Sequence, residues 1–263
     1  MSADDNPLNA SFGACAALVK AGDPDRFLSA QSAPPESRKK LMAIYAVNLE
    51  IARAPWMSAE PVVAQMRLRW WADEIAKIYQ GQRVDSHEIL LALRDVIFDH
   101  NLPQSLFDAM TTARIFDIYS EPHESREDFG AYINATAGSV MELAARVLGG
   151  GAEMLNPIRD FAYGAGVANL LRASAELHSR GRHPLLANIV EIVEDASAKL
   201  HNARAHRRSI PHSIRPALLA GWRADATLHE ARKRPASIAA GLLEESPARK
   251  MLSLRWKTLS GRW

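Results

Sequence analysis

Apolar residues recur at intervals of three and four along most of this 263-residue chain, which is the spacing of one face of an α-helix. The pattern is clear in residues 36–54, where the apolar positions include Leu41, Ile44, Tyr45, Leu49 and Ala52. Pro35 precedes this run and Pro55 follows it. Because proline is tolerated at the start of a helix but ends or kinks it further along, the pattern predicts one helix between these two prolines.

A second long run, residues 58–81, carries an apolar stripe at Val62, Val63, Met66, Trp70, Ile75 and Ile78. Gly81 is a typical C-terminal stop, because glycine adopts the left-handed conformation without steric cost. We expect the stripe to face the core and Trp70 to pack there, with stacking on a ligand as the alternative for Trp70 and Trp71.

Further helices are predicted over 86–100, 103–120, 125–148 and 157–180, followed by shorter segments after residue 188. Ser125 with Asp128 three residues later is a variant of the capping box that begins a helix. Glycines lower helix propensity, so Gly138, Gly164 and Gly166 predict either close contacts between helices or room for a bound molecule. No repeat or long linker appears, and the fold class is therefore all-α.

The composition is that of a soluble globular protein, with 48% hydrophobic and 24% charged residues. The one cysteine, Cys15, cannot form an internal disulfide, and no Cys/His cluster with metal-ligand spacing is present. The sequence shows no basic leader followed by an apolar segment and no apolar run of about 20 residues. These features favour a cytoplasmic protein.

Charge divides unevenly along the chain. Residues 201–263 hold 13 Lys and Arg against 4 Asp and Glu, whereas the first 200 residues are net acidic. The segment PARKMLSLRWKTLSGRW mixes apolar and basic residues, so it predicts a helix on an anionic membrane or an acidic partner, or a terminal helix packed on the domain. Basic residues without interleaved stacking aromatics argue against nucleic acid, and His201, His206 and His212 lack the spacing of metal ligands.

Five segments, in their order and spacing, resemble the squalene/phytoene synthase family of head-to-head prenyltransferases. They read RFLSAQSAPPESRKKLMAIYAVNLEIARA, RLRWWADEIAKIYQG, LPQSLFDAMTTARIFDI, AYINATAGSVMELAARVLG and YGAGVANLLRASAELHSRGR. The resemblance implies a single-domain helical bundle of the isoprenoid synthase type with a central cavity. It also suggests an N-terminal segment (1–20), a family-like helical domain (21–235) and a basic amphipathic C-terminal segment (236–263).

Active members of this family bind Mg²⁺ through two Asp-x-x-x-Asp motifs, whose carboxylates lie on one helix face and hold ions that bridge to the substrate diphosphate. The resemblance puts the aspartates of the first motif at Ala52 and Trp56, and those of the second at Ala173 and Leu177. None of these four side chains is a metal ligand. We therefore expect no metal site, no cofactor and no ordinary condensation of prenyl diphosphates.

The sequence NLEIAR also resembles a branch of the family that includes the mitochondrial assembly factor for respiratory complex I. This resemblance implies a non-catalytic helper whose partner is a respiratory complex subunit or another protein, with peripheral contact at the inner membrane. The alternative is an active prenyltransferase of isoprenoid biosynthesis in which Glu50, Asp117 and Glu176 replace the missing ligands for Mg²⁺. A third hypothesis is a cavity that binds an isoprenoid lipid without chemistry.

Eight polar residues are candidates for ligand binding in the cavity: Tyr45, Asn48, Glu50, Arg53, Tyr132, Asn169, Arg172 and Glu176. Each also has a structural interpretation. Glu50 and Arg53 could form a surface ion pair worth less than about 1 kcal/mol. A buried Arg172 needs an anionic partner, either Glu176 or a ligand phosphate, and the tyrosines could satisfy hydrogen bonds in the core.

Overall fold

The computed structural model describes residues 6–84, 86–119, 122–183 and 188–263, and every regular element within these ranges is helical. The longer helices are α1 (Pro7–Gly22), α3 (Pro35–Arg53), α4 (Pro61–Tyr79), α5 (Leu90–His100), α6 (Gln104–Ala113), α9 (Leu155–Ser179), α10 (Ile189–Ala205), α12 (Ala224–Lys233) and α14 (Pro247–Ser260). The shorter ones are α2 (Pro24–Ala30), α7 (Arg126–Ile133), α8 (Ser139–Val147), α11 (Arg215–Leu219) and α13 (Ala236–Ala239). The predicted all-α class is confirmed.

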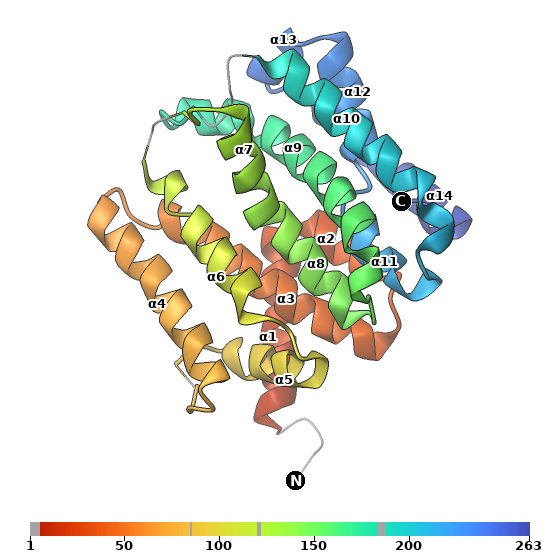
Figure 1. The fold of residues 1–263 in the computed structure, drawn as a ribbon. Coiled ribbons are helices and arrows are strands. Elements are labelled where there is room, and N and C mark those ends of the chain that lie inside the picture. The colour runs from red at the N-terminus through yellow and green to blue at the C-terminus, as the bar shows by residue number, and fades with distance from the viewer. Residues whose placement is uncertain (1–5, 85, 120–121, 184–187) are drawn as a thin grey trace.

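The helices pack around α9, which runs through the middle of the bundle (Figure 1). On one side α9 contacts α10 and α12, and on the other it contacts α8. Helix α3 packs against α1, α5 and α8, so the first and second halves of the chain meet where α8 lies between α3 and α9. One large apolar cluster joins nearly all of these helices.

Several helix ends follow from local sequence signals. Helix α3 ends at Arg53, and Pro55 lies in a short 3₁₀ turn, η2 (Ala54–Trp56). The Ser125 hydroxyl accepts a hydrogen bond of 3.0 Å from the Asp128 amide at the start of α7, as the capping-box pattern predicts. Gly81 has a φ of 70° two residues after the end of α4, where the left-handed conformation favours glycine.

Two glycines of α9 permit close helix packing. A Cβ atom at Gly164 would lie 2.4 Å from Leu200 Cγ of α10, and one at Gly166 would lie 2.6 Å from Ala137 Cβ. Both distances are shorter than any ordinary carbon contact, so both glycines permit close helix contact, and Gly166 in addition lines a cavity. Gly138 differs, because its nearest neighbour would be Asn134 of its own helical segment at 3.7 Å.

The apolar stripe predicted for α4 is wrong in its first half. The buried apolar positions are Ala64, Leu68, Trp71, Ile75 and Ile78. These positions keep a strict spacing of four and three residues, and this face packs against α6 and η2. Val62, Val63 and Met66 lie outside the face and are exposed, and Trp71 rather than Trp70 is fully buried.

The C-terminal helices close the bundle on the side opposite α4 (Figure 1). Leu254 of α14 packs with Leu219 and Trp222, and the Trp263 ring meets the Phe161 ring edge-on at 4.8 Å between centroids. Among the described helices, none has the length and apolar character needed to cross a bilayer.

Candidate functional site

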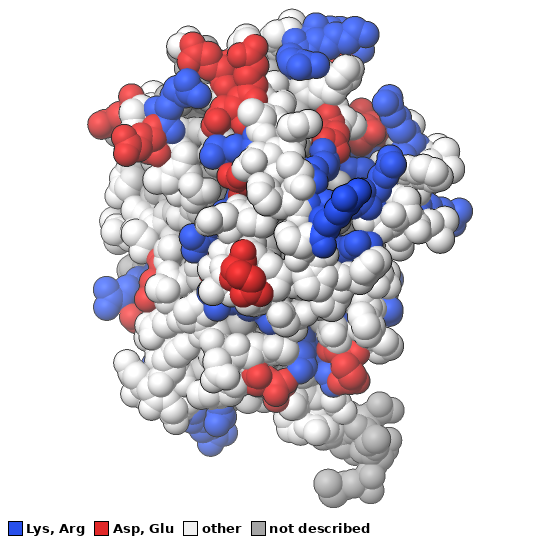
Figure 2. Space-filling view, turned by 45° about the vertical axis from the view of Figure 1, so that its right-hand side comes forward, with Lys and Arg blue, Asp and Glu red and all other residues white. Residues whose placement is uncertain are grey.

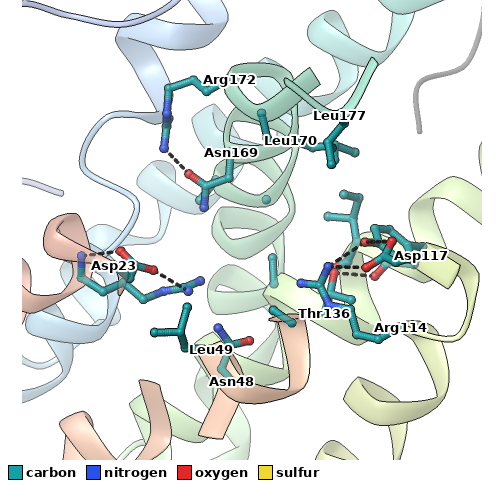
Figure 3. Close-up of a pocket in the computed structure, with 18 of the residues that line it drawn as sticks. Asp23, Asn48, Leu49, Arg114, Asp117, Thr136, Asn169, Leu170, Arg172 and Leu177 are labelled. Atoms are coloured by element: carbon teal, nitrogen blue, oxygen red, sulfur yellow. Dashed lines mark hydrogen bonds and ion pairs between the residues drawn. The ribbon is translucent and has the colours of Figure 1, made fainter. Parts of the chain in front are cut away.

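A cavity of about 400 Å³ lies between α3, α9 and the segments that join the neighbouring helices. One wall is formed by η4 (Asn134–Gly138), a stretch of π-helix between α7 and α8 that contributes Thr136 and Ala137. Such π-segments open the regular helical ladder and occur often at functional sites. Figure 3 shows α9 running along the cavity, with Asn169, Leu170, Arg172 and Leu177 on it.

All four positions that the family resemblance assigned to the motif aspartates line this cavity. Ala52 comes from α3 and Trp56 from η2, while Ala173 and Leu177 come from α9. The Arg182 guanidinium lies 5.6 Å from the centre of the Trp56 ring, within the range of a cation–π contact. This part of the wall is apolar and faces a cation.

On one side of the cavity, where Figure 3 labels Arg114 and Asp117, these two residues form a closed hydrogen-bonded group with Tyr132. Arg114 Nη1 donates to Asp117 Oδ2 at 2.7 Å and to the Tyr132 hydroxyl at 2.9 Å. The Tyr132 hydroxyl in turn donates to Asp117 Oδ1 at 2.8 Å. Burial raises the pKa of Tyr132, so its phenol keeps the proton that it donates.

On the other side, two aspartates from the start of α2 are held by arginines. Asp23 Oδ2 lies 3.0 Å from Arg26 Nη1, and Asp23 also caps α2 by accepting from the Arg26 amide. Asp25 Oδ2 accepts from Arg223 Nη1 at 2.7 Å, and Arg223 Nη2 donates to Glu244 at 2.9 Å. Together with Asp117, these are the aspartates of the described cavity wall, and each is bound to an arginine.

Arg172 reaches the cavity from α9 with little exposure to solvent. Its Nη2 donates to Asn169 Oδ1, its Nη1 donates to Thr227 at 3.2 Å, and its Nε lies 3.6 Å from Glu244. Burial, followed by the charge of Arg223, lowers the pKa of Arg172 to about 10. The guanidinium therefore stays charged at neutral pH but has a weak, partly exposed anionic partner.

Most charges of the described cavity wall are paired, because Arg26, Arg114 and Arg223 bind the three aspartates, and Glu244 lies beside Arg172 and Arg223. Five arginines line the wall, Arg26, Arg114, Arg172, Arg182 and Arg223, against the three aspartates. A Mg²⁺ cluster needs several carboxylate oxygens that converge without competing cations. In the described ranges no group of three or more His, Cys, Asp or Glu side chains has that arrangement, so the wall does not fit such a cluster.

The structure brings four of the eight candidate residues to the cavity, Asn48, Tyr132, Asn169 and Arg172. The other four lie elsewhere. Tyr45 is buried in the core beside Arg26, and its hydroxyl has no hydrogen-bond partner among the described residues. Glu50 and Arg53 pair with each other at 4.0 Å, and Glu176 pairs with Arg180 at 2.5 Å on the surface.

Of the two partners expected for Arg172, Glu176 is wrong, and a ligand phosphate stays a prediction. Glu176 is four residues further along α9 but turns outward to Arg180, and Glu244 takes the place beside Arg172. The sequence reading also missed Asp25 and Arg223 at the cavity. The signal for Arg223 was its position between Trp222 and Ala224. An arginine beside apolar residues is buried only where an anionic partner offsets the cost of removing its charge from water.

Comparison with known proteins places these features in a family. The squalene/phytoene synthase family matches residues 19–187. Among curated relatives, complex I assembly factor 6 homolog of Drosophila melanogaster is 28% identical over 205 residues, which are 75% of this chain and 60% of that protein. Complex I assembly factor 6 of Mus musculus is 22% identical over 231 residues, which are 78% of this chain and 69% of the mouse protein.

Solved structures show the same fold. A dehydrosqualene synthase in complex with ligand aligns with a TM-score of 0.75 at 18% identity, over 97% of this chain and 99% of that one. Squalene synthase HpnC from Alicyclobacillus acidocaldarius aligns with a TM-score of 0.77 at 18% identity, over 87% and 95%. The family match spans well over half of the chain, so this protein belongs to the squalene/phytoene synthase family.

Proposed function

We propose that this protein is a non-catalytic member of its family that supports the assembly of a membrane respiratory complex of the complex I type. The observation that carries the proposal is the composition of the cavity wall. Ala52, Trp56, Ala173 and Leu177 stand where the resemblance puts the motif aspartates. The aspartates that do line the cavity are neutralised by arginines.

The relatives support the second half of the proposal. The fly, mouse and cattle proteins that resemble this chain are all named as assembly factor 6 of complex I. The chain spans 60% of the length of the fly protein, and the role of the whole relative is carried over here as a proposal. An assembly role needs a stable fold and a recognition surface, and it does not need a metal centre.

The chemistry is tested by diphosphate release. Purified protein is incubated with farnesyl or geranylgeranyl diphosphate and Mg²⁺, and squalene synthase HpnC is run in parallel as an active control. We expect release no faster than in protein-free buffer, because no described set of carboxylates can hold the ions at the leaving group. Turnover by this protein above that background would favour the alternative function, an active prenyltransferase.

The apolar walls and Arg172, which faces the partly exposed Glu244 at 3.6 Å, favour one further role for the cavity, which is to hold an anionic lipid such as an isoprenoid phosphate without reacting with it. The apolar walls suit the chain, and the guanidinium group suits the head. Native mass spectrometry of the protein as isolated checks this role. A bound mass that organic extraction identifies as a lipid supports it, and an empty cavity in every preparation contradicts it.

A further inference from the structure

The C-terminal helix α14 packs on the domain mainly through charged side chains, unlike an ordinary surface helix. Its inward face carries only one buried apolar side chain, Leu254. The remaining inward contacts are ionic: Lys257 Nζ lies 3.1 Å from Asp225, and Lys250 Nζ lies 2.6 Å from Glu244. A surface helix normally turns its apolar stripe to the core.

The apolar stripe of α14 faces solvent instead. Leu252, Trp256 and Leu259 are 68%, 63% and 86% exposed, and their spacing of four and three residues puts them on one face of the helix. No part of the described chain packs over them. Leu242, just before the helix, is also exposed.

Basic side chains border this stripe. At 100° per residue, the exposed Arg249 and Arg255 flank the stripe on either side around the helix axis, and Arg249 also lies 3.5 Å from Glu245. At the end of α14, Arg207 Nη2 donates to the Gly261 carbonyl at 2.7 Å. In Figure 2, which brings the right-hand side of Figure 1 forward, Lys and Arg side chains gather on the right-hand half of the molecule.

Several arginines lie close together at the end of α14, and their charges affect the pKa of one of them. The charges of Arg215, Arg262 and Arg204, after burial, lower the pKa of Arg207. Like charges that crowd together gain free energy when an anion comes between them. In this cluster Arg204 is paired with Asp225 and Arg207 donates to the Ser260 and Gly261 carbonyls, so the cluster places positive charge beside the end of α14.

We propose that the outward face of α14 is a docking surface for an anionic phospholipid membrane. Leu252, Trp256 and Leu259 enter the boundary between headgroups and acyl chains, and the flanking arginines bind the phosphates. Tryptophan at the centre of the stripe suits this boundary, because its ring is apolar and its N–H is polar. Only the biological purpose of this membrane contact rests on the proposed assembly function. Lipid binding is measured separately from complex I activity, so either proposal can fail without the other.

Co-sedimentation with vesicles tests the docking surface. The 263-residue protein is mixed with vesicles of phosphatidylcholine alone or with added phosphatidylglycerol, at low and high salt. We expect binding to the anionic vesicles that weakens as salt is added, and little binding to the neutral ones. Equal binding to both compositions, or none to either, overturns the proposal.

Matched variants locate the contact. Leu252→Ser/Trp256→Ser/Leu259→Ser should weaken the partition coefficient at least about tenfold, because three inserted apolar side chains are lost. Val62→Ser/Met66→Ser is the control, since it removes two side chains equally exposed on α4. Unchanged binding by the α14 variant, or equal loss in the α4 variant, contradicts the proposal.

Two further readings separate insertion from other outcomes. Brominated lipids quench a tryptophan that enters the bilayer, so quenching should fall in Trp256→Phe while vesicle binding persists. Unchanged quenching shows that Trp256 stays outside the membrane. One more outcome assigns the face to a second copy of the chain instead. In that outcome the parent forms a dimer in solution and binds no vesicles, and the α14 triple variant is monomeric.

Discussion

At the scale of single residues, arginines outnumber carboxylates on the described cavity wall, five against three. Arg223 is the extreme case, because only 5% of its side chain is exposed and it contacts Asp25, Glu244 and Glu245. A buried charge of this kind is tolerated only with several partners. Arg223 thus ties α2 to the segment that leads into α14.

Removing this charge should destabilise the fold. Arg223→Met should lower the free energy of unfolding by about 2–4 kcal/mol, because it leaves the partner carboxylates without their cation. Urea denaturation followed by circular dichroism measures the loss. The control is Arg234→Met, which breaks an exposed pair with Glu230 and should cost less than about 1 kcal/mol. Equal losses in the two variants would contradict this account.

Four of the eight residues that the sequence suggests as cavity residues line the cavity. Asn48 and Arg172 could be found because polar side chains in apolar helices lie at a core or a cavity. The distant partners of Arg172 could not be found, because Glu244 and Thr227 lie more than fifty residues away and helix periodicity carries no information about which helices meet. Glu176 is close in sequence to Arg172, yet a second basic residue, Arg180, is available to it on the outer face of α9.

At the scale of helices, α9 is the element on which the packing depends. Its glycines let α10 and the π-segment η4 approach on two sides, which places the cavity residues of α9 opposite those of α3. The sequence predicted this helix and its two special glycines. It did not predict which face of α4 is buried, because two apolar stripes were available there and only the packing partner selects between them.

Gly164→Ala should destabilise the protein despite the better helix propensity of alanine. The new methyl group would lie 2.4 Å from Leu200 Cγ and 2.9 Å from the Ala196 carbonyl oxygen, so α10 must shift. We expect a net loss of about 1–3 kcal/mol in the free energy of unfolding.

The control for this change is Gly13→Ala in α1. A Cβ atom there meets nothing within 4 Å, so propensity alone should raise stability by up to about 1 kcal/mol. Thermal unfolding of both variants and the parent gives the comparison. A stabilised Gly164→Ala variant would show that α9 and α10 are not packed this closely.

The docking of α14 should depend on pH through Asp225. Burial raises the pKa of this carboxyl, but hydrogen bonds from Arg204 and the charge of Lys257 outweigh burial and lower it below its ordinary value. A lowered folded-state pKa means that the contribution is complete above the unfolded pKa of about 4 and is lost as pH falls through the folded value.

Asp225→Asn removes this titration. At pH 7 the variant should unfold more easily than the parent by about 1 kcal/mol, a modest value because the carboxylate is half exposed. The difference between the two proteins, measured by urea denaturation, should shrink as pH is lowered from 5 toward 3. A difference that stays constant over this range would mean that the Arg204 and Lys257 contacts contribute nothing to stability.

At the scale of the whole molecule, the solved structures that share the fold and the curated relatives carry different names. The chain has the fold of dehydrosqualene and squalene synthases, while its curated relatives are named for the assembly of complex I. The family and its fold could be predicted from the order of short segments along the chain. The function could not be read from the fold, because a fold supports many activities and the side chains at the site decide between them.

The central claim is that the protein assists a respiratory complex and makes no isoprenoid. Deleting the gene in its source organism and measuring NADH:ubiquinone oxidoreductase activity in membranes, beside carotenoid and hopanoid content, tests both halves at once. We predict that oxidoreductase activity falls severalfold and returns with the reintroduced gene, while isoprenoid content is unchanged. Full oxidoreductase activity in the deletion strain, or loss of an isoprenoid product, would contradict the account.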